Sequence, residues 1–163
     1  MPRPSHRLDL VFVPHDRPIG HGHRLLQRLI DGGVVDERGA AGPEATRWVP
    51  GGFARIWVDD PGRPTLYANR LGGFRVSCPR QAANLVPAFW QAVTAWRAGA
   101  PRRLSSCPAC GESHDLAELD IRPPAAFGRW ALVVADAAEA ALTTEARATV
   151  DEALGPLSRV LRR

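Results

Sequence analysis

Two cysteines separated by two residues, Cys107 and Cys110, lie in the stretch SSCPACGESHDL. A Cys-x-x-Cys turn aims both sulfurs and two backbone N–H groups at one tetrahedral metal ion. Such an ion takes four ligands, so the others must come from elsewhere in the chain. The third cysteine, Cys78, lies far upstream. If Cys78 is a ligand, the fold must bring two distant turns together, which strongly restricts the arrangement of strands and helices.

The sequence around Cys78 echoes the sequence around the cysteine pair. Aligning VSCPRQAANL with SSCPACGESHDL places Cys78 over Cys107 and Gln81 over Cys110. Glutamine is a poor zinc ligand, because protein zinc sites use sulfur, imidazole nitrogen or carboxylate oxygen. The first copy of the turn therefore lacks its second ligand.

The two turns together resemble a zinc ribbon, and the resemblance covers roughly residues 74–121. The second turn, CPACG, matches the pattern of a zinc knuckle, whereas the first departs from it at Gln81. The zinc ribbon is a broad architectural class. The resemblance therefore implies a structural metal and a recognition surface, and it implies no reaction.

His114 offers a fourth ligand, because Cys78, Cys107, Cys110 and His114 would form a Cys3His set, which is usual for structural zinc. The alternative is a decayed site whose shape persists through packing without metal. A redox role for Cys107 and Cys110 is disfavoured, because the polar residues GESH follow them in place of the helix that would activate a thiol.

Composition places the chain among ordinary globular proteins of one domain, residues 1–163. It has 45% hydrophobic and 23% charged residues, with a net charge of +4. All 21 basic residues are arginine, which points to a GC-rich coding bias and weakens the case for a polyanion partner. The odd number of cysteines argues against a disulfide scaffold. With no apolar run long enough for a membrane span and no signal-peptide pattern at the start, we expect a cytoplasmic bacterial protein.

The first half of the chain predicts a strand, a helix and then three more strands. Residues 8–13 form a short apolar run, and residues 23–30 place four aliphatic side chains on one helical face before two glycines. The segments 52–58, 64–70 and 74–78 are separated by turn-forming residues and read as three short antiparallel strands.

The second half predicts two helices and three strands. Helices are expected over residues 84–97 and 144–154, and strands over 116–121, 129–135 and 157–163. The whole pattern predicts an α+β fold, in which helices cover one face of a mostly antiparallel sheet. The zinc-ribbon-like segment, with its own helix, would be an elaboration of that sheet.

Three histidines, His15, His21 and His23, lie between the first strand and the first helix. They could form a metal or acid–base cluster, but a flexible entry to the helix is the simpler interpretation. Motifs for dinucleotide binding, a phosphate-binding loop, a nucleophile elbow and an HExxH zinc helix are missing from the sequence.

A partner-binding surface is expected around the helix at 84–97. Trp90 lies off its apolar stripe and could be exposed, and Arg97, Arg102 and Arg103 follow it. We therefore expect a non-enzymatic accessory or adaptor protein that binds another protein and carries a structural zinc. Nucleic-acid binding through the ribbon and its arginines is the alternative, and a metal-dependent or thiol enzyme is a third possibility.

Overall fold

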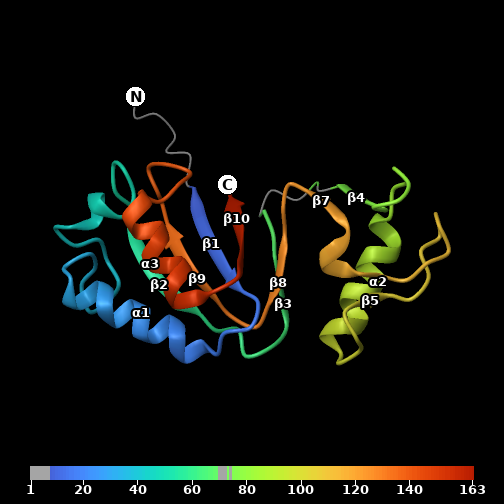
Figure 1. The fold of residues 1–163 in the computed structure, drawn as a ribbon, viewed down its shortest axis with the longest axis horizontal. Coiled ribbons are helices and arrows are strands. Elements are labelled where there is room, and N and C mark those ends of the chain that lie inside the picture. The colour runs from blue at the N-terminus through green and yellow to red at the C-terminus, as the bar shows by residue number, and fades with distance from the viewer. Residues whose placement is uncertain (1–7, 70–72, 74) are drawn as a thin grey trace.

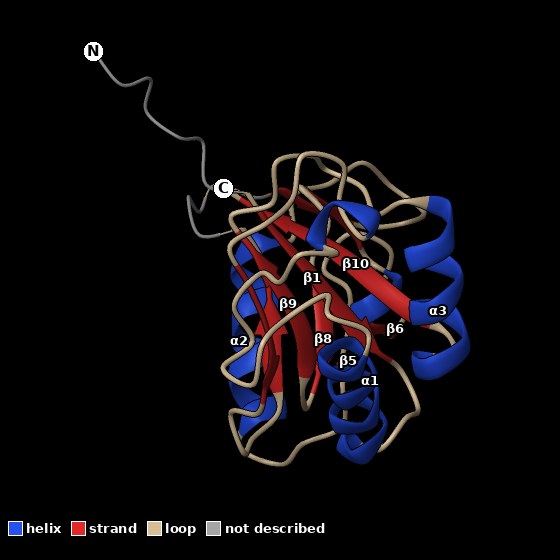
Figure 2. Ribbon diagram, turned by 90° about the vertical axis from the view of Figure 1, so that its left-hand side faces the viewer, coloured by secondary structure: helices blue, strands red, loops and turns tan. Residues whose placement is uncertain are grey.

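The computed structural model describes residues 8–69, 73 and 75–163. Its centre is a four-stranded sheet in the order β10-β1-β9-β2, and each neighbouring pair is antiparallel. Its strands are β1 (Asp9–Pro14), β2 (Arg55–Asp59), β9 (Ala131–Ala135) and β10 (Leu157–Arg162). Figure 2 shows β10, β1 and β9 side by side. The N-terminal strand is therefore enclosed by two strands from the C-terminal third of the chain.

Between β2 and β9 the chain makes one long excursion, and strands on its outward path pair with strands on its return path. The antiparallel pairs are β3 (Thr65–Tyr67) with β8 (Ala126–Gly128), β4 (Arg75–Ser77) with β7 (Asp120–Arg122), and β5 (Arg103–Leu104) with β6 (His114–Asp115). Helix α2 (Val86–Arg97) follows β4. The residues of the far end, 75–122, are called the tip lobe and lie to the right in Figure 1.

The prediction that 52–58, 64–70 and 74–78 pair with one another was wrong. Each segment contains a strand, but each strand pairs with one from the return path. The turn after β2, in which the Asp60 carboxylate accepts a hydrogen bond from the N–H of Gly62 (3.1 Å), leads the chain away from the sheet edge. Tyr67 is then buried in the cluster on one face of the four-stranded sheet. Strand β3 therefore packs on that face and does not add a fifth strand to the edge of the sheet.

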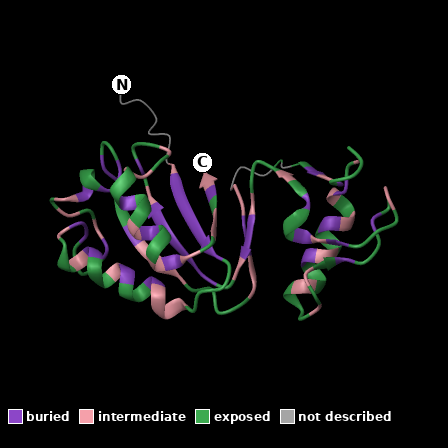
Figure 3. Cartoon of the chain, viewed as in Figure 1, coloured by how far each residue is buried: buried purple, intermediate pink, exposed green. Residues whose placement is uncertain are grey.

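Both faces of the four-stranded sheet are covered, which explains why all six residues of β1 are buried. The first face meets helices α1 (Ile19–Asp31) and α3 (Thr144–Leu154). Because side chains alternate along a strand, Leu10 and Phe12 join the helices in one cluster, whereas Val11 and Val13 join a second cluster with Tyr67. Figure 3 shows β1 coloured as buried along its length. The predicted α+β fold with a mostly antiparallel sheet is confirmed.

Helix α1 begins four residues before the predicted segment 23–30, so the expected flexible entry was wrong. His21, Gly22 and His23 are helical, and Gly22 is buried against the ring of Trp130. The glycine that suggested flexibility instead allows a large aromatic side chain to pack against the helix backbone. The indole N–H of Trp130 donates to the Arg17 carbonyl at 2.8 Å, which fixes the ring in place.

The predicted strand at 116–121 was wrong in its first half, where the 3-10 helix η2 (Leu116–Glu118) forms. The Asp115 carboxylate accepts from the N–H of Ala117, and the Glu118 carboxylate accepts from the N–H of Asp115, so a capping box starts the turn. The predicted helices at 84–97 and 144–154 and the C-terminal strand are confirmed as α2, α3 and β10. The strand predicted at 129–135 is β9, which starts at Ala131.

The excursion has an apolar core of its own, separate from the two clusters on the four-stranded sheet. It extends beyond 74–121, because Leu66 and Phe127 belong to it. Its buried members are Leu66, Val76, Cys78, Leu85, Phe89, Val93, Leu104, Cys107, Leu116, Leu119 and Phe127. A short 3-10 helix, η1 (Ala45–Arg47), packs at the other end of the molecule. Within the described ranges, the helices are too short or too polar to cross a bilayer.

Replacing Gly22 with alanine should destabilise the protein, although alanine is the better helix former. A Cβ at Gly22 would lie 2.4 Å from Cζ3 of Trp130, and this buried, hydrogen-bonded ring cannot move aside easily. We expect overpacking to lower the free energy of unfolding by about 1–3 kcal/mol in urea titrations. The matched control is Gly20→Ala, whose Cβ would meet only Arg24 at 3.7 Å and should leave stability unchanged or raised. Equal effects of the two substitutions would contradict this packing.

Candidate metal centre

Cys78 lies in the turn directly after β4. The N–H of Cys78 donates to the carbonyl of Ala83 (3.3 Å), which closes the turn. The N–H of Arg80 points back at the Cys78 sulfur from 3.4 Å. A backbone N–H directed at the cysteine sulfur is part of the knuckle geometry, so the first turn keeps this shape although Gln81 replaces its second cysteine.

The loop between β5 and β6 forms the second turn. The N–H of Gly111 donates to the carbonyl of Cys107 at 2.8 Å, and the N–H of Cys107 donates to the carbonyl of Glu112, also at 2.8 Å. Gly111 has φ of +77°, a conformation that glycine adopts without strain. Pairing of Leu104 with His114 then places the histidine beside the cysteine turn.

The structure brings the four predicted ligands together. The sulfurs of Cys78, Cys107 and Cys110 and a ring nitrogen of His114 all lie within 4.8 Å of one another. Nε2 of His114 lies 3.1 Å from the Cys110 sulfur and 3.7 Å from the Cys78 sulfur. Bonds of about 2.3 Å to sulfur and about 2.05 Å to nitrogen separate two tetrahedral ligands by about 3.6 Å. The donor set therefore fits a tetrahedral metal ion.

Burial gives the cluster the character of a closed site. Cys107, Cys78 and His114 are 1%, 4% and 7% exposed, and Cys110 is half-buried. Cys78 and Cys107 are also members of the apolar core of the excursion. Gln81, by contrast, is exposed and stands outside the cluster. Four protein ligands complete a tetrahedron, whereas a catalytic zinc keeps one position for water or substrate.

An ion pair joins the two turns at the surface. The guanidinium of Arg80 lies 2.9 Å from the carboxylate of Glu112, although both side chains are largely exposed. Arg80 is two residues after Cys78, and Glu112 is two residues after Cys110. Sequence reasoning missed this pair, although the opposite charges at equal offsets from the two turns were visible. The pair contributes little to the free energy of folding because both side chains are exposed. It nevertheless brings together the same two turns that meet in the cysteine–histidine cluster.

Hydrogen bonds distribute negative charge unequally among the thiols. Burial acts to raise the pKa of Cys107, but N–H groups of Cys110 and Ala109 donate to its sulfur, as do neighbouring thiols, and the net pKa is lowered. For Cys110, the N–H of Glu112 acts to lower the pKa, but burial and the sulfurs of Cys78 and Cys107 outweigh it and raise the pKa. Of these two cysteines, Cys107 therefore becomes a thiolate more readily.

The three N-terminal histidines do not converge. His15 lies after β1, where its Nε2 is 2.8 Å from the Ser158 hydroxyl. His21 and His23 are two residues apart on α1, so they point in different directions. Across the described residues, these histidines take part in no cluster of three or more metal-ligating side chains.

The predicted partner-binding residues divide among three surfaces. Trp90 is 41% exposed on α2, and Arg97 lies seven residues later on the same helical face. Arg102 instead pairs with Asp115 at 2.9 Å and faces a cleft between the tip lobe and the rest of the molecule. Arg103 lines a separate groove between α2 and β5. The proximity of these arginines in the sequence predicted one basic patch. Because successive side chains of an extended chain point to opposite sides, Arg102 and Arg103 instead lie on different surfaces.

No family model, curated protein or solved structure matches this chain. The chemistry of the cluster is therefore inferred from its own residues.

The fourth position of the cluster can be tested with Co²⁺, which reports tetrahedral thiolate ligation through its visible absorption. We expect His114→Ala to weaken Co²⁺ binding by more than about tenfold, because losing a direct ligand costs more than losing a group that only hydrogen-bonds to a ligand, which changes affinity by about 10–100-fold. The matched control is Gln81→Ala, which should bind Co²⁺ as the unmodified chain does. If Gln81→Ala loses Co²⁺ binding and His114→Ala keeps it, the fourth ligand is Gln81, and the assignment of His114 is wrong.

Proposed function

We propose that this protein is a small bacterial cytosolic adaptor whose tip lobe is stabilised by one zinc ion and binds another protein. The observation that carries the zinc proposal is the convergence of three cysteines and one histidine in a largely buried cluster. Thiolate and imidazole ligands in a tetrahedron suit zinc better than the hard cations, which prefer oxygen. Reduced thiols also suit a cytosolic location.

Zinc would stabilise a part of the fold that has few other long-range bonds. The strands β4 to β7 are two or three residues long, and each belongs to a two-stranded pair. Isolated two-stranded pairs are at best marginally stable in water. A metal that binds Cys78 on one turn and Cys107, Cys110 and His114 on the other would join the outward and return paths.

The proposed contact surface lies on α2. Trp90, Thr94 and Arg97 occur at i, i+4 and i+7, so they form one exposed helical face. Tryptophan and arginine are enriched among the residues that dominate protein interfaces, and Trp90 is the exposed large apolar side chain among the described residues. Helix α2 also packs on the core that contains two of the cysteines, so metal binding would hold this face rigid.

A protein partner fits these surfaces better than nucleic acid does. A strand of nucleic acid needs several cations along one path. Arg97, Arg102 and Arg103 face three different directions, and the charge of Arg102 is opposed by Asp115. No reaction is proposed, because the four protein ligands leave no open metal position for a substrate.

Purified protein should contain about one equivalent of zinc by elemental analysis, and Cys107→Ser should remove it. We expect the backbone amides of residues 75–122 to exchange faster with deuterium in this variant, because the tip lobe loses its cross-link. Amides of β1 and β9 should keep their protection, since they belong to the separate core of the four-stranded sheet. Ser106→Ala, an exposed neighbour, is the control. Zinc-free protein with full protection in the tip lobe would overturn the zinc proposal.

The adaptor proposal predicts that Trp90→Ala strongly reduces capture of a specific partner from cell extract. An interface tryptophan contributes about 2 kcal/mol or more, so binding should weaken about 30-fold. Gln91→Ala, the exposed neighbour on a different helical face, should bind normally. Capture by the unmodified chain should persist at high salt. Retention on single-stranded DNA that falls steeply with salt would instead support the nucleic-acid alternative.

A further inference from the structure

A cleft separates the tip lobe from the four-stranded sheet and α1, and it is distinct from the metal centre. Its volume is about 470 Å³, which lies within the usual range of about 300–1,000 Å³ for small-molecule sites. A second hollow of about 380 Å³ shares His15, Arg102 and Phe127 with it. The two hollows therefore form one depression along the junction.

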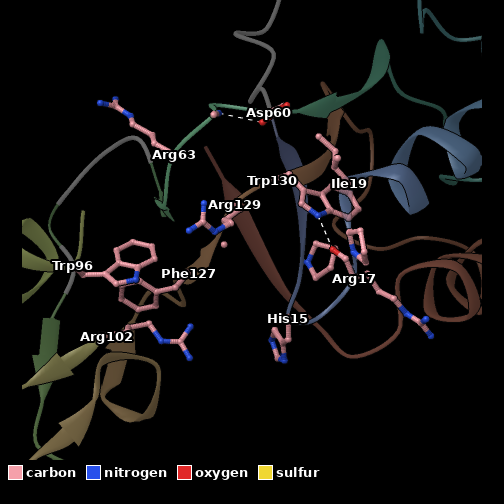
Figure 4. Close-up of a pocket in the computed structure, with 14 residues that line it drawn as sticks. His15, Arg17, Ile19, Asp60, Arg63, Trp96, Arg102, Phe127, Arg129 and Trp130 are labelled. Carbon is pink, nitrogen blue, oxygen red and sulfur yellow. Dashed lines mark hydrogen bonds between the residues drawn. The ribbon is translucent and has the colours of Figure 1, made fainter. Parts of the chain in front are cut away.

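Aromatic side chains form both walls of this cleft (Figure 4). Trp130 and Ile19 stand on one side, and Trp96 and Phe127 stand on the other. Trp96 meets Phe127 edge to face, with ring centroids 5.2 Å apart and planes at 84°. Trp130 is held by its hydrogen bond to the Arg17 carbonyl and by its contact with Gly22. The walls are thus fixed before any ligand arrives, and they suit a flat apolar group.

Positive charge lies between the aromatic walls. Figure 4 shows the guanidinium ends of Arg102 and Arg129 turned toward the space between Phe127 and Trp130. Arg102 lies 5.6 Å from the centre of the Phe127 ring and is oriented by Asp115 at 2.9 Å. For Arg129, no acidic partner is found among the residues that the structure describes.

Other charged groups at the cleft leave it positive. The acidic residues of the lining are Asp60, whose carboxylate accepts a hydrogen bond from the N–H of Gly62, and Asp16 in the second hollow. His15 adds a ring nitrogen at the mouth, and Arg63 lies at the rim with its guanidinium directed outward in Figure 4. Four arginines and two aspartates line the two hollows, and Asp115 offsets part of the charge of Arg102. The depression therefore keeps a net positive charge, which suits an anionic ligand such as a phosphate monoester.

We propose that this cleft binds a small phosphate monoester that carries a planar ring, of the size and chemistry of a nucleoside monophosphate. The ring lies against the aromatic walls formed by Trp96 and Trp130. The phosphate accepts hydrogen bonds from Arg129 and Arg102, whose forked donors match two phosphate oxygens. The site uses residues of both the tip lobe and the four-stranded sheet, so the ligand would bridge them.

Calorimetric titration of the purified full chain with adenosine monophosphate, adenosine and inorganic phosphate tests this proposal. We expect adenosine monophosphate to bind at least about tenfold more tightly than either fragment, since ring and phosphate are bound together. Arg129→Met should weaken this binding at least about tenfold, because a charged hydrogen-bond donor is lost. Arg129 is exposed and takes part in none of the ion pairs among the described residues, so the variant should retain the melting temperature of the unmodified chain.

Two further variants make the outcome decisive. Arg38→Met removes the same charge from an exposed position outside the cleft and should leave binding unchanged. Trp96→Leu should weaken adenosine monophosphate more than inorganic phosphate, because the change removes a wall for the ring. The proposal is overturned if adenosine monophosphate does not bind at millimolar concentration, if Arg38→Met and Arg129→Met weaken it equally, or if phosphate binds as tightly as the nucleotide.

Discussion

The nested antiparallel pairing of the excursion is the constraint on which the rest of the structure depends. Each strand leaving the sheet finds its partner on the way back, so chain segments far apart in sequence meet at successive levels. The metal cluster occupies the outermost part of this arrangement, where Cys78 follows β4 and His114 begins β6. The cleft forms nearer the sheet, where Phe127 of β8 faces Trp130 across the junction. Both candidate sites thus follow from one topological pattern.

The two proposed ligands would act on different parts of the tip lobe. A metal bound by the two turns would fix its internal geometry, and the apolar core beneath them contains Cys78 and Cys107 themselves. The β3–β8 pair connects this lobe to the sheet, and Gly128 allows it to approach closely, because a Cβ there would meet Val13 at 2.3 Å. A ligand in the cleft would act across this connection, whereas a metal acts within the lobe. On these proposals, metal binding would control the internal order of the lobe, and the cleft ligand would control its position relative to the sheet.

Residue chemistry and local periodicity predicted the parts of this structure that depend on short-range order. The echo between the two turns related Cys78 to the Cys107–Cys110 pair, the Cys3His ligand set indicated His114, and helical spacing indicated α2 and α3. Strand partners were not predictable, because strands of two or three residues carry too little alternation to define a register. The early start of α1 depends on Trp130, which is distant in sequence. The cleft was likewise not predictable, because its walls come from elements that are far apart in the sequence.

The pairing of Tyr67 with Ala126 has a consequence for how the chain could be shortened. These two residues cover the second face of the sheet, and everything beyond them belongs to the far end of the excursion. Directly opposed residues on antiparallel strands lie about 5 Å apart, a gap that a two-residue type I′ turn closes. A miniature protein joined there would keep both layers around β1 and lose the cysteines. Leu66 and Phe127 would lose the outer core against which they pack, so the shortened protein would need polar residues at these two positions.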